Sequence, residues 1–160
     1  MDSYVDTIFG LPVHALVVHG AVVLIPLAAI GAILIAVRPT FSRRYGLLVV
    51  LVAGAGAISA FVARLSGEQL AERVGKPEQH AELGTVLPFI ATGLFVIVLV
   101  FWLFDRGIPA SKYRPMWLVI FAIVVVLVAC FAIYWTVRVG HSGTTAVWGP
   151  IIENTNPQGE

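Results

Sequence analysis

Apolar residues run along this chain in four long blocks that are separated by short polar stretches. The blocks cover residues 11–37, 45–62, 86–104 and 116–137. A helix needs roughly 20 residues to cross a hydrocarbon core of about 30 Å, and each block is close to that length or longer. Because a chain inside a bilayer has no water to satisfy its backbone, each block is predicted to be a helix. Including their flanks, we expect helices at about 11–37, 45–66, 84–105 and 115–140.

Composition supports a membrane protein with one domain. Of the 160 residues 59% are hydrophobic and only 12% are charged, and the mean hydropathy is +0.93, values outside the usual range of soluble domains. Short connections make consecutive helices antiparallel neighbours. The predicted fold is therefore all-α: one up-down-up-down four-helix bundle over residues 1–160, with a short helix in the loop at residues 66–75 and a polar tail at 141–160.

The distribution of charge predicts an orientation. The connections after the first and third blocks carry six cationic residues and one acid, Asp105, whereas the opposite side carries eight acids and four cationic residues. Lys and Arg accumulate on the cytoplasmic side. We therefore expect both termini to be extracytoplasmic in a bacterial plasma membrane. No basic stripe is present, which argues against nucleic-acid binding, and the lipid bilayer and other membrane or respiratory subunits are the expected partners.

Four short motifs carry a resemblance to a known family. They are Gly10-Leu-Pro-Val-His14 with Val18-His19, Ser66-Gly-Glu68, His80-Ala-Glu-Leu-Gly84 and Gly140-His-Ser-Gly143. Together they resemble a family of predicted four-helix bacterial membrane proteins of unknown function, in particular its actinobacterial members. The resemblance covers about residues 10–148 and implies the bundle and its location, but no activity.

All four histidines lie at block ends that this threading places on the extracytoplasmic side: His14, His19, His80 and His141. Imidazole is the commonest metal ligand in proteins, so the sequence predicts a histidine cluster that binds a metal or cofactor. His14 and His19 are five residues apart, which places them about 140° apart around a helix. They therefore cannot both face the same neighbouring helix.

A b-type haem, held by two imidazoles from different helices, is the favoured cofactor. His19 and His141 are the preferred axial pair, with His14 and His80 as substitutes. Arg64 and Arg138 would then meet the haem propionates. Such a protein would transfer electrons within or beside a respiratory complex.

Three alternatives remain open. The first is a copper or zinc site that uses the histidines, with Glu68 or Glu82 as an outer partner. The second is a structural accessory or assembly subunit, in which the histidines bind backbone carbonyls and the outer loop. The third is a metal-dependent enzyme, which is less favoured because the His-Glu-x-x-His spacing of common metallopeptidases is absent; no catalytic residue is predicted.

Overall fold

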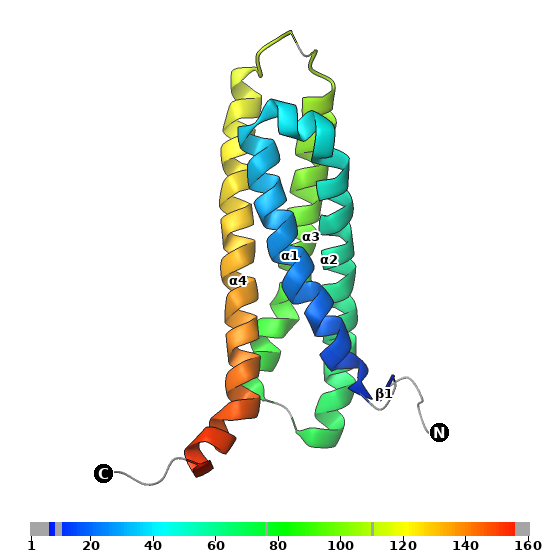
Figure 1. The fold of residues 1–160 in the computed structure, drawn as a ribbon, viewed down its shortest axis with the longest axis vertical. Coiled ribbons are helices and arrows are strands. Elements are labelled where there is room, and N and C mark those ends of the chain that lie inside the picture. Colours follow the sequence, from blue (N-terminus) through cyan, green and yellow to red (C-terminus); the bar gives the residue numbers. More distant parts are fainter. Residues whose placement is uncertain (1–6, 9–10, 76, 110, 156–160) are drawn as a thin grey trace, which may run out of the picture.

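A computed structural model describes residues 7–8, 11–75, 77–109 and 111–155. Four helices form an up-down-up-down bundle, which confirms the predicted all-α fold (Figure 1). They are α1 (Val13–Val37), α2 (Pro39–Val74), α3 (Glu78–Arg106) and α4 (Met116–Thr155). All four are long and apolar enough to span a membrane. Before α1, the two-residue strands β1 (Thr7–Ile8) and β2 (Leu11–Pro12) pair antiparallel.

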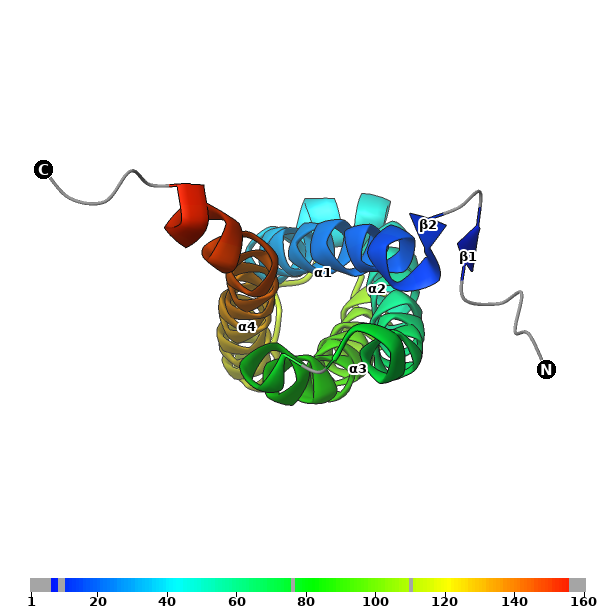
Figure 2. The same ribbon diagram turned by 90° about the horizontal axis from the view of Figure 1, so that it is seen from below.

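The helices follow one another around the bundle, so α1 and α3 lie on opposite sides and α2 and α4 lie between them (Figure 2). The start of α1 and the last turns of α4 lie at the same end of the bundle (Figure 1). We call this the histidine end, because it holds the starts of α1 and α3 with His14 and His80. The other end, with Arg38 and Arg114, is the arginine end.

Three helices, α2, α3 and α4, are longer than the sequence predicted. Helix α3 begins at Glu78 rather than near residue 84, and α2 begins at Pro39 rather than near residue 45. Proline suits the first position of a helix because its missing N–H is not needed there, and it holds Arg38 in an extended conformation (φ −119°, ψ 105°). The connection predicted at residues 38–44 is therefore mostly helical.

The far end of α2 also corrects the prediction. Residues 66–74 are not a separate loop helix but the last turns of α2. The predicted end point is confirmed, because Gly75 has a φ of 91°, which favours glycine, and its N–H donates to the carbonyl of Ala71. In the same way α4 continues helically to Thr155 through most of the predicted tail, and its last turns bend away from the bundle (Figure 1).

Small residues bring α1 and α2 close together. A Cβ on Gly31 would lie 2.9 Å from Val49, and one on Gly56 would lie 3.2 Å from Ile25. Large apolar side chains instead face outward, for example Leu51 and Leu127, which are 60% and 64% exposed. A surface of this kind is suited to lipid rather than water.

Candidate functional site

At the histidine end, the His14 side chain crosses from α1 to the end of α2. Its Nδ1 lies 2.8 Å from the carbonyl oxygen of Ala63 and 3.5 Å from Oγ of Ser66. The ring also packs on Gly67, where a Cβ would come within 2.9 Å of the imidazole. Any residue larger than glycine would therefore displace the ring. His14 is consequently held by a carbonyl, a hydroxyl and a glycine on one face of α2.

His80 makes the same contacts between α3 and α4. Its Nδ1 lies 3.2 Å from the carbonyl oxygen of Val139 and 3.2 Å from Oγ of Ser142. A Cβ on Gly143 would come within 2.9 Å of the His80 ring. His80 is therefore also held by a carbonyl, a hydroxyl and a glycine.

The two halves of the bundle thus repeat one arrangement. In each half a histidine near the start of the first helix (α1 or α3) contacts three groups on the second helix (α2 or α4). These groups are a backbone carbonyl, the serine three residues after that carbonyl and the glycine four residues after it. One face of a helix carries positions i, i+3 and i+4, which explains why all three groups meet one ring. The pair α1–α2 and the pair α3–α4 therefore share one contact motif at the histidine end.

The hydrogen bonds define which ring nitrogen is available. A carbonyl oxygen only accepts, so Nδ1 of each histidine must donate its proton to Ala63 or Val139. In the neutral imidazole the proton-free Nε2 then keeps its lone pair. Histidines that bind metals usually donate the other ring N–H in this way, which fixes the tautomer and the ring orientation.

The two rings also lie next to each other in a T-shaped arrangement. Their centroids are 6.3 Å apart and their planes are inclined by 78°. Two imidazoles that bind one metal from opposite sides, at about 2.0–2.1 Å per bond, have ring centres roughly 6 Å apart. The residue types, the tautomers and the separation of His14 and His80 therefore fit a centre with two imidazole ligands.

The structure places the other two histidines elsewhere. His19 is exposed on α1, and its Nδ1 bonds to the carbonyl of Ala15 one turn earlier. His141 is exposed on α4. His19 does not face α2 because His14 and His19 are about 140° apart around the helix, so only one of them can face α2. The pair that the structure brings together is thus the substitute pair, His14 and His80, and not His19 with His141.

The charged residues proposed as secondary partners have contacts of their own. Arg64 pairs with Glu68 one turn later at 3.1 Å, and Glu68 is 59% exposed. Arg138 donates to the hydroxyl of Tyr134 at 3.3 Å. Glu82 is exposed.

Within the described residues, no group of three or more His, Cys, Asp and Glu side chains lies close enough to hold a metal ion. A zinc site with three protein ligands therefore has no support there.

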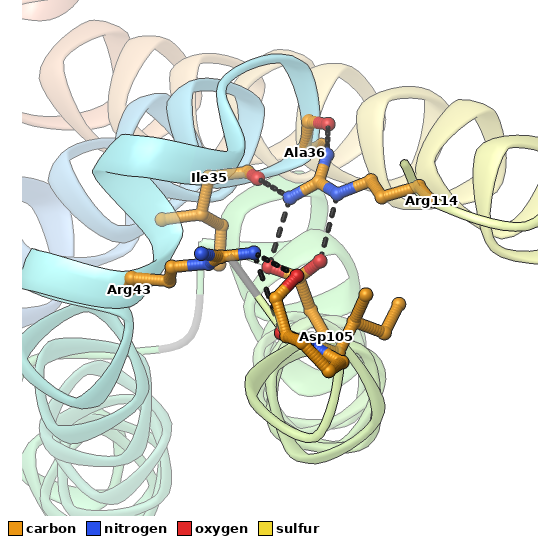
Figure 3. A network of polar contacts seen from close by, with 7 residues as sticks. Ile35, Ala36, Arg43, Asp105 and Arg114 are labelled. Atoms are coloured by element: carbon orange, nitrogen blue, oxygen red, sulfur yellow. Dashed lines mark hydrogen bonds and ion pairs between the residues drawn. The ribbon is translucent and has the colours of Figure 1, made fainter. Parts of the chain in front are cut away.

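The arginine end holds a polar network that the sequence reading missed (Figure 3). Arg114 forms two bonds to the Asp105 carboxylate, at 2.7 and 2.9 Å, and both side chains are almost fully buried. It also donates to the carbonyls of Ile35 and Ala36 in the last turn of α1. The last carbonyls of a helix have no partner within the helix. This network therefore closes the end of α1 and ties it to α3.

A nearby arginine extends the network to the connection between α3 and α4. Arg43 donates to the carbonyls of Ile108 and Pro109, at 3.3 and 3.1 Å (Figure 3). One signal in the sequence pointed here: Asp105 is the only acid among the cations of this side. A lone acid next to a membrane segment usually has a partner. We call the network of Arg43, Asp105 and Arg114 the clasp, because it joins the end of α1, the end of α3 and the connection between α3 and α4.

The fold and the histidine end together define a four-helix integral membrane protein with two equivalent, carbonyl-held imidazoles near one end of the bundle. Residues 10–156 match the family described as predicted membrane protein, DUF2231, so the chain belongs to this uncharacterised family. No curated protein and no solved structure matches the chain.

Proposed function

We propose that this membrane protein binds one transition-metal centre, either a haem b or a copper ion, between Nε2 of His14 and Nε2 of His80. The proposal rests on the neighbouring rings of His14 and His80, whose centroids are 6.3 Å apart and whose Nδ1 atoms each bond to a carbonyl. Haem needs only two protein ligands because the porphyrin supplies the other four. A soft, low-coordinate copper ion is the second centre compatible with two imidazoles.

The chain's own residues would keep both ligands in place. The carbonyls of Ala63 and Val139 hold the Nδ1 protons and therefore keep each Nε2 free of a proton. Ser66 and Ser142 add a second acceptor beside each ring. When bound, such a centre supplies a one-electron redox couple. Electron transfer within or beside a respiratory complex is the function we propose for it.

The charge distribution supports a location for this centre. With Lys and Arg concentrated at the arginine end, the histidine end and both termini would face the outside of a bacterial plasma membrane. The redox partner would then approach from that side.

Purification in mild detergent without chelators tests the proposal. We expect either a Soret band that shifts on reduction, with about one iron per chain, or about one copper per chain without a Soret band. Protein that folds but stays colourless and metal-free, even after haemin or Cu(I) is supplied, would overturn the proposal. That result would favour an accessory subunit in which the two histidines only join helices through the carbonyls of Ala63 and Val139.

Gly67 and Gly143, which pack against the histidine rings, allow a test of how metal content depends on ring position. Gly67→Ala and Gly143→Ala each place a Cβ within 2.9 Å of an imidazole, so the ring must move and its Nδ1 bond must lengthen. We expect each variant to lose most of its bound metal, because losing an outer partner of a ligating histidine typically costs 10–100-fold in metal affinity. Metal analysis after purification measures the loss.

Gly84→Ala is the matched control for both glycine variants. Gly84 lies on α3 one turn beyond His80, and nothing lies within 4 Å of a Cβ placed there. Equal metal content in all three variants would show that the rings do not need their glycine contacts.

A further inference from the structure

A groove of about 370 Å³ opens on the outer surface of the bundle at the arginine end. It lies between the end of α1 and the start of α4, which are neighbours in both views of the ribbon (Figures 1 and 2). Its lining combines small or exposed apolar residues with one arginine: Ala36, Val37, Pro39, Arg114, Val119, Ala122, Ile123 and Val126. The volume is at the lower end of the roughly 300–1,000 Å³ typical of ligand sites.

The arginine end, where the groove lies, is strongly cationic. Residues 38–44 and 105–116 contain six cationic side chains, and the only acid there, Asp105, is paired with Arg114. Subtracting this pair leaves five cations: Arg38, Arg43, Arg44, Arg106 and Lys112. Arg38 is exposed and lies between two residues of the groove wall, Val37 and Pro39. An apolar groove therefore ends beside an exposed arginine.

We propose that this groove binds one anionic phospholipid, with an acyl chain along Val119, Ala122 and Ile123 and the phosphate at Arg38. An acyl chain matches the apolar walls, since Val119 and Ile123 are 42% and 57% exposed where bilayer lipid would contact them. Basic sites between membrane helices bind anionic head groups. A zwitterionic phospholipid also matches the shape of the groove, but its head group is attracted less strongly by the surrounding cations.

Native mass spectrometry of the intact protein tests this site. The protein is released from mixed micelles that contain phosphatidylglycerol and phosphatidylcholine in equal amounts. We expect one retained phosphatidylglycerol per chain. Arg38→Gln should weaken this binding about fivefold, the effect of one cation at a membrane surface. Ala122→Leu, which fills the groove with an apolar side chain, should remove the bound lipid while the circular dichroism spectrum stays helical.

Arg106→Gln is the matched control, because it removes a cation at the same end without touching the groove. Arg106 lies on α3 above the ring of Trp102, at 4.8 Å. Equal retention of the two lipids by the wild type would overturn the proposal. Equal losses of bound phosphatidylglycerol in Arg38→Gln and Arg106→Gln would also overturn it, because they would indicate binding to the overall charge. Unchanged lipid retention in Ala122→Leu would overturn it as well.

Discussion

Replacing Asp105 by Asn is expected to lower the free energy of unfolding by about 3–5 kcal/mol, the usual cost of removing one partner of a buried ion pair. The side chains of Asp105 and Arg114 are only 3% and 9% exposed, so the arginine charge would remain buried without its counter-ion. The variant would also loosen the bonds from Arg114 to the end of α1. Thermal or denaturant unfolding in detergent micelles, followed by circular dichroism, measures the loss.

The matched control for this variant is again Arg106→Gln. It changes a charge next to Asp105 in sequence, but Arg106 is exposed, so the expected change is within about 0.5 kcal/mol. A melting temperature for Asp105→Asn equal to that of Arg106→Gln would show that the clasp does not stabilise the bundle.

Replacing either His14 or His80 by Ala is expected to abolish the bound metal centre. The centre has only two protein ligands in this account, so the loss of one leaves no specific site. The helices should still form, because each variant loses one hydrogen bond to a carbonyl, worth about 1 kcal/mol. Absorption spectra and metal analysis of the purified variants measure the effect.

His19→Ala and His141→Ala are the controls for these variants. Both histidines are exposed, and the Nδ1 of His19 bonds to the carbonyl of Ala15 on its own helix. We expect wild-type metal content in both. Loss of the centre in His19→Ala and His141→Ala, with retention in His14→Ala and His80→Ala, would instead identify the pair first chosen from the sequence.

The bundle could be predicted because membrane helices follow from one property, the length of an apolar block. The errors lie at helix ends, where polar sequence was read as loop. Residues 66–74 and 141–155 are polar enough to suggest loops, yet they extend α2 and α4. Hydropathy marks only the part of a helix inside the hydrocarbon, and says nothing about how far the helix continues into water.

The sequence predicted a histidine cluster but not which histidines lie together. The sequence placed the histidines at one end of the bundle, where the structure has His14 and His80. The ring directions depend on how each helix is rotated, which apolar blocks without a polar face do not reveal. Both Ser-Gly dipeptides, at residues 66–67 and 142–143, stand in the family motifs, but their repetition was not used to choose between the histidines. Each copy lies where a histidine ring meets the neighbouring helix, and this repeat would have favoured His14 and His80.

The most direct measurement of the central claim is a pulsed electron paramagnetic resonance spectrum of the oxidised protein, prepared with ¹⁵N-labelled histidine. We expect nuclear couplings from two imidazoles on one paramagnetic centre, and the loss of this signal in both His14→Ala and His80→Ala. A wild-type spectrum with no centre, with one imidazole, or with two that persist in His80→Ala would contradict binding between His14 and His80.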